Sequence, residues 1–433
     1  MLQDPRQALD RTLLLMRDEF LLHVTDAQLL DALRSTQVAL VIDAANSASH
    51  SAQTAYVTAA LLMARSAHRV YVVGPDVSLA MRQLPLRHDR MVSALLEAAG
   101  RILPQVEFHS SPPRGRLDLE VRFGDTPSKV RARRSIAVSA SPWTAYLSEG
   151  IGTRWASTFW PFGGLACGPI VAAEAFKLSM TKLAAFARNP GTFKHLMGIA
   201  RSVTFALAPD DTPTLSDLGE FDMVSAGAII NAALYVLGRV PDASGIGRVI
   251  DRDEGDVSNL NRNALFTIDS VRRPKAEVLA QCVPPGLRLD PVIERYDEAT
   301  ARRLDPLAAR VLVGVDDIPT RWRVQRGQPA WLGVGATTHW SAMASFHVAG
   351  LPCAGCLHPT DDPNDAPVPT VAFVSFWAGL LLSVYYIRSL SSARSEEMLQ
   401  QTFLTPLRPE LPWRTPVQRH RRCPVCGNVR TVL

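Results

Sequence analysis

The stretch FDMVSAGAIINAALYVLGRV, from Phe221 to Val240, joins a short apolar run to a longer one through a turn of small residues. The first run has the length of a buried strand, and the second has the length of a helix. A tight strand-to-helix turn is typical of the first crossover in a doubly wound α/β sheet. We therefore predict a strand, a turn and a helix here.

The same rhythm continues downstream of this unit. The following segments predict a strand, a helix and two further strands in turn: GRVIDRDE, RRPKAEVLAQCV, RLDPVIERYD and the run from Ala308 to Asp317. Strands that alternate with helices predict a mostly parallel sheet, and ligands then bind beyond the carboxyl ends of its strands.

The upstream part of the chain has a strand–helix rhythm of its own. Val38–Ala45 is predicted as a strand, and its following turn, AANSASHSAQ, lacks the glycines that let backbone N–H groups approach a phosphate. A long helix is expected over Gly163–Ala187. We predict two Rossmann-like sheets that form a pseudo-dimer within one chain. The expected domains are residues 1–200, without phosphate chemistry, and residues 201–433.

Composition narrows the classes of partner. The 433 residues carry a formal net charge of +5, an excess too small and dispersed to predict nucleic-acid binding. The start of the chain predicts an amphipathic helix and lacks the pattern of a signal peptide. Val371–Ile387 is apolar, but Ser375, Gly379 and Ser383 interrupt it. A buried strand–helix element is predicted there, with a peripheral membrane contact as the alternative, and the chain is expected to be cytoplasmic.

Four of the six cysteines form two CxxC pairs, Cys353 with Cys356 and Cys423 with Cys426. In a chain without a secretion signal this spacing favours metal over disulfides, and zinc prefers four tetrahedral thiolates. A closed shell of four thiolates leaves no open position for catalysis. The pairs therefore predict a structural zinc site that fixes the C-terminal tail to the body of its domain.

Polar residues collect at the predicted strand ends. Ser225 stands where the glycine-turn fingerprint has its first glycine, and Asn231 follows the position of the third. Asp251 ends the next strand, about 20 residues after Gly227, where an acidic residue can bind a ribose hydroxyl. A helix cap or a surface charge would explain this aspartate equally well. Three asparagines and an arginine follow in DVSNLNRNALF, from Asp256 to Phe266, where a capped, solvated loop is the alternative to an anion site.

Two further positions complete the polar set. Lys275 opens a predicted helix, where it is either a solvated lysine or a second cation for the anion. Asp316 and Asp317 end a buried strand, and adjacent carboxylates there favour a cation such as Mg²⁺. The alternative for Asp317 is a helix N-cap, so we place Asp316 on the metal and Asp317 in a local role. No Walker-type GxxxxGK[ST] motif occurs, which argues against a P-loop enzyme.

The segments SNLNRNALF, RRPKAEV and DDIPTR, in this order and followed by two CxxC pairs, resemble the ThiF/MoeB/ubiquitin-activating superfamily. The resemblance covers about half of the chain, from Phe221 onward. It assigns Gly227 to the nucleotide turn and Asp251 and Asp253 to the ribose and phosphate surroundings. It also assigns Asn259, Arg262 and Lys275 to the ATP phosphates and Asp316 to magnesium; Asn231 and Asp317 complete the expected nucleotide-binding set.

The resemblance implies ATP-dependent adenylation of the C-terminal glycine carboxylate of a ubiquitin-like protein. A conjugating-enzyme-like protein would be the next partner, and the oligomeric state stays open, a homodimer included. An N-terminal arginine in this family often reaches the γ-phosphate, for which Arg6, Arg11 and Arg17 are the candidates. The first half would then be the inactive partner that supports the site.

Departures from the family pattern leave alternatives. The crossover segment LHPTDDPNDAPVPTVAF contains no cysteine, and Cys167 and Cys282 are expected to be buried structural thiols. Thr360, activated by His358, is a minor alternative to direct transfer from the acyl-adenylate. Competing functions are a sulfur-carrier-protein adenylyltransferase, a nucleotide-binding scaffold without catalysis, and an NAD(P)-dependent oxidoreductase, which SNLNRN and the CxxC pairs disfavour.

Overall fold

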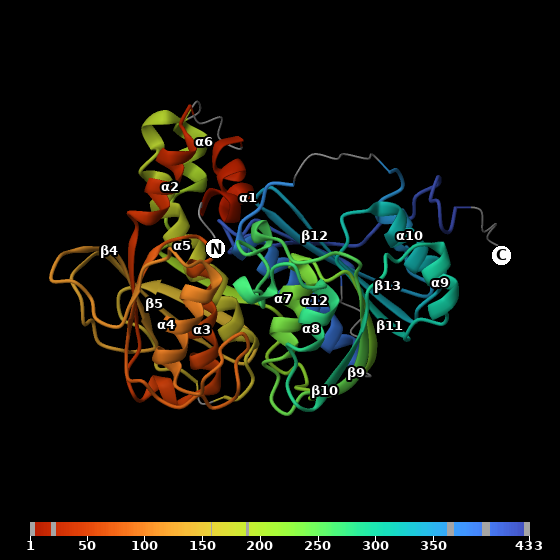
Figure 1. Ribbon diagram of the computed structural model, residues 1–433, viewed down its shortest axis with the longest axis horizontal. Helices are drawn as coiled ribbons and strands as arrows, with labels where there is room; N and C mark the ends of the chain where they lie inside the picture. Colours follow the sequence, from red (N-terminus) through yellow and green to blue (C-terminus); the bar gives the residue numbers. More distant parts are fainter. Residues whose placement is uncertain are drawn as a thin grey trace.

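A computed structural model describes residues 5–18, 23–156, 158–187, 190–361, 368–391 and 399–427, with residues 190–192 described for the backbone alone. Two sheets lie side by side, each with helices packed on it (Figure 1). The first sheet belongs to the N-terminal half and the second to the C-terminal half. Their shared strand order confirms the predicted pair of Rossmann-like sheets.

The first sheet has the strand order β3-β2-β1-β4-β5-β6-β7. The strands β1 to β5 pair in parallel, and β6 and β7 add an antiparallel edge. Their bounds are β1 Gln37–Val41, β2 Arg69–Val73, β3 Phe108–His109, β4 Leu117–Phe123, β5 Ala132–Ala140, β6 Thr144–Glu149 and β7 Ser202–Ala206. The helices of this half are α1 Pro5–Asp18, α2 Asp26–Arg34, α3 His50–Ala64, α4 Met91–Ile102, α5 Phe162–Thr181 and α6 Pro190–Leu196.

The second sheet has the order β10-β9-β8-β11-β12-β13-β14-β15, so its first five strands repeat the order of the first sheet. The strands from β10 to β12 are parallel, and β13 to β15 are antiparallel. The bounds are β8 Asp217–Val224, β9 Ser244–Ile250, β10 Leu287–Val292, β11 Arg310–Val313, β12 Trp331–Thr338, β13 Ser341–Val348, β14 Gln401–Leu404 and β15 Trp413–Thr415. The helices are α7 Ala228–Leu237, α8 Lys275–Ala280, α9 Glu298–Leu304, α10 Ile318–Arg326, α11 Ala354–Leu357 and α12 Ala372–Leu390.

The two halves share one hydrophobic core, because buried residues from both form a single cluster. The helices α3 and α5 of the first half meet α7 and α12 of the second at its centre. Phe176 and Phe373 pack edge to face across this junction with ring centroids 5.5 Å apart. The hydroxyls of Thr58 and Tyr235 form a hydrogen bond of 2.9 Å. The halves are thus fused through apolar surface, which is the main source of association energy in water.

Three expectations need correction. Val371–Ile387 contains no strand, since α12 begins at Ala372 and continues to Leu390. This helix is long and apolar enough to cross a membrane, but 83 % of its most apolar window is buried inside the molecule. The parallel strand β12 and the antiparallel strands β13 to β15 were not anticipated. The expected division after residue 200 places β7 in the second half, whereas β7 pairs with β6 of the first sheet.

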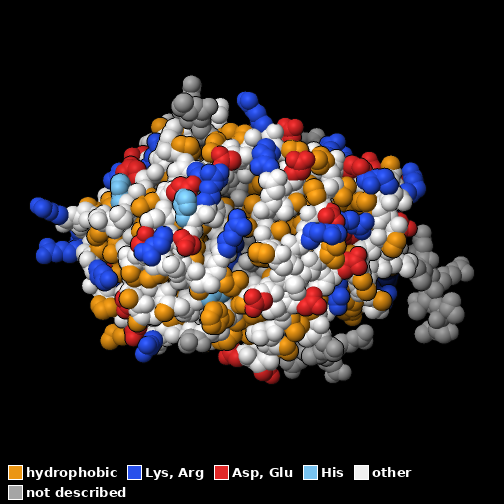
Figure 2. Space-filling view, turned by 60° about the horizontal axis from the view of Figure 1, so that its bottom comes forward, with side chains coloured by type: hydrophobic (Ala, Val, Ile, Leu, Met, Phe, Trp, Pro, Cys, Tyr) orange, Lys and Arg blue, Asp and Glu red, His pale blue; other side chains and the backbone are white. Residues whose placement is uncertain are grey.

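Charge is dispersed on the surface. On the face shown in Figure 2, basic and acidic side chains are interspersed among polar and apolar ones. Charged side chains of the surface pair locally, as in the contact of Arg69 with Glu107 at 2.6 Å and that of Arg303 with Glu294 at 2.6 Å. Exposed ion pairs of this kind contribute little to stability because water screens them.

Candidate active site

A cavity of about 500 Å³ lies at the carboxyl ends of the parallel strands β8 to β11 in the second sheet. Loops after these four strands form its walls, and α1 of the first half adds one side chain, Arg11. A doubly wound sheet places its ligand at this edge. Of the predicted nucleotide contacts, eight line the cavity: Gly227, Asp251, Asp253, Asn259, Arg262, Lys275, Asp316 and Asp317.

The turn after β8 brings backbone N–H groups to the cavity. Ser225 has a φ of 102°, and its hydroxyl accepts a hydrogen bond of 2.9 Å from the N–H of Gly227, which caps α7. Asp251, at the end of β9, accepts from the N–H of Ala226 at 2.6 Å and from that of Asp253 at 2.8 Å. Burial raises the pKa of the Asp251 carboxyl, and these two bonds oppose the shift. The aspartate therefore fixes the turn as well as facing the ligand space.

The residues Asp256 to Phe266, here called the asparagine loop, form the next wall. The side chain of Asp256 caps a 3-10 turn over Val257–Asn259. In return, the side-chain oxygen of Asn259 accepts a hydrogen bond of 3.0 Å from the N–H of Asp256. Leu265 and Phe266 are buried, which confirms that they anchor the loop to the core. Capped at one end and anchored at the other, the loop holds Asn259 and Arg262 against the cavity.

Two arginines from different halves face the cavity. Arg262 donates to the carbonyl of Ser258 and, at 2.9 Å, to the side chain of Asn261. Burial and the nearby charge of Arg11 lower the pKa of Arg262 to about 10. Among the three N-terminal candidates, all within the described part of the chain, Arg11 lines the cavity and Arg6 and Arg17 do not. An anion between Arg11 and Arg262 would relieve their repulsion.

Lys275 adds a further cation at the start of α8. Its ammonium lies 3.2 Å from a carboxylate oxygen of Asp253, and its N–H donates to the carbonyl of Asp253 at 2.8 Å. The lysine is therefore tied to the loop after β9. A cation at a helix N-terminus is mildly unfavourable, and the acidic partner offsets this effect.

The two aspartates after β11 have different surroundings. Asp317 caps α10, because its carboxylate accepts a bond of 2.8 Å from the N–H of Thr320. Asp316 lines the cavity without a cap role of this kind. Arg321 is buried and donates to the carbonyl of Val315 at 3.0 and 2.7 Å, which holds the strand end in place. A carboxylate at the cavity wall fits Mg²⁺, which binds through one or two carboxylates together with phosphates.

Asn231 differs from the predicted contact with nucleotide. Its side chain is fully buried and is not among the groups that line the cavity. The amide oxygen accepts from the N–H of Leu265 at 2.8 Å, and the amide nitrogen donates to the carbonyl of Ala226 at 3.4 Å. Asn231 therefore links the glycine turn to the asparagine loop from the interior of the protein and not from the cavity.

The loop after β1, the first strand of the other sheet along the chain, carries a buried asparagine. Asn46, which follows β1, is 2 % exposed. Its side-chain amide donates to Asp43 at 3.0 Å and to Asp125 at 2.9 Å, and its oxygen accepts from the N–H of Trp155 at 3.1 Å. The side chain of Asn46 thus links the loops that follow β1 and β4 at this end of the first sheet.

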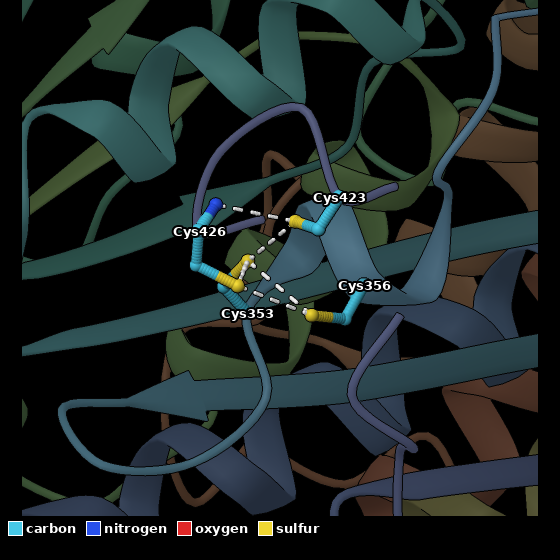
Figure 3. A group of neighbouring side chains, drawn as sticks. All are labelled: Cys353, Cys356, Cys423 and Cys426. Carbon is cyan, nitrogen blue, oxygen red and sulfur yellow. Dashed lines mark hydrogen bonds between the residues drawn. The ribbon is translucent and has the colours of Figure 1, made fainter. Parts of the chain in front are cut away.

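The four cysteines of the CxxC pairs converge, as Figure 3 shows. Their sulfur atoms all lie within 4.8 Å of one another, and the contacts of Cys353 with Cys356 and Cys423 are 3.8 and 3.4 Å. Four thiolates at 2.3 Å from a tetrahedral zinc would be about 3.8 Å apart. A Cβ on Gly355 would lie 2.9 Å from the sulfur of Cys423, so glycine permits the close turn. The donor set and its geometry fit zinc.

The other two cysteines have the character of structural thiols. Burial raises the pKa of Cys167 to about 12 and that of Cys282 to about 11. The Nε2 atom of His358 lies 2.9 Å from a guanidinium nitrogen of Arg321, and the role of His358 as a base for Thr360 stays a prediction. Residues 362–367 of the crossover segment lie outside the described residues.

Several site residues were missed by the sequence analysis. Glu294, Arg295 and Tyr296 line the cavity beyond β10, and their place at a strand end was the available signal. Arg65 of the first half, at the end of α3, contacts the back of the asparagine loop. In the sequence, the only sign of this contact was a single arginine within the apolar run LLMARSA.

Comparisons with known proteins agree with this geometry. The ThiF family model matches residues 242–425, and the model of the BilD N-terminal domain matches residues 37–192. A sulfur carrier protein adenylyltransferase of Thermus thermophilus is 31 % identical over 214 residues, which cover 44 % of this chain and 76 % of that protein. The SAMP-activating enzyme E1 of Haloferax volcanii is 28 % identical over 218 residues, or 47 % of this chain and 79 % of that protein.

An uncharacterized protein of Sinorhizobium fredii is 26 % identical over 284 residues, covering 65 % of this chain; the chain spans about half, 54 %, of that relative's length. Among solved structures, the E. coli enzyme MccB in complex with N-formylated MccA has a TM-score of 0.42 and 15 % identity, over 67 % of this chain and 98 % of that one. The match to the Thermus relative covers more than two thirds of that protein, and the family model spans the cavity walls from β9 onward. The chain therefore belongs to the ThiF family.

Proposed function

We propose that this chain adenylates the C-terminal carboxylate of a small protein with ATP. The observation that carries the proposal is the cavity beyond β8 to β11, where Arg11, Arg262 and Lys275 gather near Asp316. An anion between Arg11 and Arg262 would relieve the repulsion of their charges, and the nearby carboxylate of Asp316 suits the metal ion that accompanies nucleotide phosphates. The Thermus and Haloferax relatives carry activating or adenylyltransferase names, which support the same chemistry.

The proposed roles follow from position. Gly227 and Asp251 would hold the nucleoside side, and Asn259, Arg262 and Lys275 the phosphates. A carboxylate oxygen of the partner attacks the α-phosphorus, and the bond from that phosphorus to the bridging oxygen breaks to release pyrophosphate. Magnesium held by Asp316 would neutralise phosphate charge. No general base is required, because the attacking carboxylate is already ionised near pH 7. Catalysis then rests on positioning and on cationic stabilisation of developing charge.

The finer proposal concerns the partner. We infer a ubiquitin-like protein that ends in glycine, followed by transfer to a conjugating-enzyme-like protein in the cytoplasm. The cysteine-free crossover segment and the high pKa values of Cys167 and Cys282 favour direct transfer from the acyl-adenylate over a thioester. Residues 1–200 would act as the inactive half, which the side chain of Asn46 in its turn supports.

A sulfur-carrier protein is the second candidate partner. The observation in its favour is the match to the Thermus sulfur carrier protein adenylyltransferase. Both candidates share the adenylation step. They differ in what attacks the acyl-adenylate afterwards, a sulfur donor in one case and a conjugating partner in the other.

ATP–pyrophosphate exchange tests the adenylation step. Exchange should appear with a small candidate protein that ends in glycine and disappear when its terminal carboxylate is amidated. Asp316→Ala should reduce exchange by at least about a hundredfold, as loss of a charge-stabilising group does. Asp290→Ala, an exposed aspartate outside the cavity lining, is the matched control and should exchange normally. Exchange that survives Asp316→Ala unchanged would show that the metal assignment is wrong.

A further inference from the structure

Arg65 is a buried cation between the two halves. It caps the C-terminal end of α3 and is 1 % exposed. Its guanidinium donates to three backbone carbonyls of the asparagine loop: Leu260 at 2.6 Å, Ala264 at 2.7 Å and Phe266 at 2.9 Å. Within the described residues it forms no ion pair. A charge left in the interior without a carboxylate partner is costly, so its carbonyl bonds are what hold it there.

The three bonds decide which way the asparagine loop faces. Carbonyls that point at Arg65 turn away from the cavity, while Asn259, Arg262 and Asn263 of the same segment line it. The loop is also held by Asn231 through the N–H of Leu265 and by Thr12 of α1 through the side chain of Asn261, at 3.2 Å. The guanidinium of an arginine presents five N–H donors in a fixed planar arrangement, which the compact ammonium of a lysine does not reproduce.

We propose that Arg65 is a positioning residue that the first half supplies to the nucleotide site of the second. It holds the asparagine loop in the conformation that presents Asn259 and Arg262 to the phosphates. Its positive charge, buried behind the loop, adds to the attraction for a phosphate. The proposal rests on the proposed function for its ligand, ATP, but the loop conformation can be tested without any ligand.

Arg239 provides a matched control. It is also 1 % exposed and also lies at the junction of the halves, with its guanidinium over the ring of Tyr235. Its bonds go to the carbonyls of Tyr235 and Leu84, neither of which belongs to the asparagine loop. Arg65→Lys and Arg239→Lys therefore remove the same chemical group from two equally buried positions, and both keep a positive charge.

The first measurement is amide hydrogen exchange on the full chain without nucleotide. Arg65→Lys should speed exchange in residues 256–266, whereas Arg239→Lys should leave that segment unchanged and speed exchange near residues 84 and 235–239. Unchanged exchange of 256–266 in Arg65→Lys would overturn the proposal. Faster exchange throughout the chain, equal in both variants, would also overturn it, because Arg65 would then serve stability alone.

The second measurement is calorimetric binding of ATP and of adenosine. Arg65→Lys should weaken ATP binding by about tenfold and leave adenosine binding unchanged, because only the phosphate side is disturbed. Arg239→Lys should bind both as the wild type does. A loosened loop with unaltered ATP affinity would overturn the positioning role. If the wild-type chain binds no ATP, the proposed function fails instead, and the exchange measurement still decides whether Arg65 holds the loop.

Discussion

At position 225 the backbone adopts a conformation that disfavours the side chain it carries. A φ of 102° lies in the region that glycine enters easily and other residues enter at a cost. Ser225 offsets part of this cost, because its hydroxyl accepts the N–H of Gly227 at 2.9 Å. The turn thus keeps its shape although serine replaces its first glycine. The hydrogen bond of the serine hydroxyl stabilises a backbone conformation that glycine would adopt without strain.

Two substitutions separate strain from hydrogen bonding at this turn. Ser225→Ala keeps the strain and loses the hydroxyl, so it should lower the free energy of unfolding by about 1 kcal/mol. Ser225→Gly loses both and should be more stable than Ser225→Ala by about 1 kcal/mol. Thermal unfolding of both variants beside the wild type measures the order. An alanine variant at least as stable as the glycine variant would show that the turn is unstrained.

Site residues were predictable from the sequence where they directly follow a recognisable strand. Gly227, Asp251 and Asp316 line the cavity because parallel strands bring their carboxyl ends to one edge, and the strand pattern was visible. Asn231 and Arg65 were not predictable in the same way. Their roles depend on contacts with a segment that lies about 30 or 200 residues away, and helical periodicity shows only that such a side chain is buried.

The helices α7 and α12 approach closely at a glycine. A Cβ on Gly379 would lie 2.5 Å from the Cβ of Ala232 and 2.6 Å from the carbonyl oxygen of Ile229. Backbone atoms cannot move aside as a flexible side chain can. The glycine therefore sets the distance between the two helices that carry the second half of the shared core.

Gly379→Ala should lower the thermal midpoint, although alanine is the better helix former. The clash with backbone costs about 1–3 kcal/mol, which exceeds the gain in helix propensity of about 1 kcal/mol. Gly100→Ala, in the exposed part of α4, is the control, because no atom lies within 4 Å of its added Cβ. That variant should raise the midpoint. A raised midpoint in Gly379→Ala would show that helix propensity outweighs packing here.

Apolar periodicity predicted most parallel strands and their helices. It predicted neither β12 nor the antiparallel strands that follow it. The runs of β12 and β13, from Trp331 to Thr338 and from Ser341 to Val348, contain small residues and lack clear alternation. Burial on both faces removes the alternation that marks a half-exposed strand. The expected strand at the start of α12 failed for a related reason, because a fully apolar run has no periodicity that separates strand from helix.

At the scale of the molecule, the two halves repeat one strand order and share one core, and the cavity described above lies at the strand ends of the second half. Arg11 and Arg65 cross from the first half to the site of the second. Both contacts fit the proposal that the first half supports the nucleotide site of the second. This division was visible in the sequence through AANSASHSAQ, whereas the side chains that cross between halves were not.

The cysteine cluster should bind zinc and hold the C-terminal tail to the second half. Cys423 and Cys426 lie on the tail, and Cys353 and Cys356 follow β13. Purified protein should contain about one zinc per chain by elemental analysis, because four converging thiolates bind it tightly. Cys423→Ser should reduce this content severely and speed amide exchange in residues 413–427, with the first sheet unchanged.

Cys282→Ser is the control that separates zinc binding from general loss of a thiol. Cys282 lies outside the cluster, after α8, so this variant should keep its full zinc content. The contrast matters because β15 pairs with β14, and Arg414 donates to the carbonyl of Ala206 in the first sheet at 2.9 Å. Release of the tail would therefore loosen a contact between the halves as well as an edge strand. Full zinc content in Cys423→Ser, or equal loss in both variants, would contradict a four-thiolate site with this role.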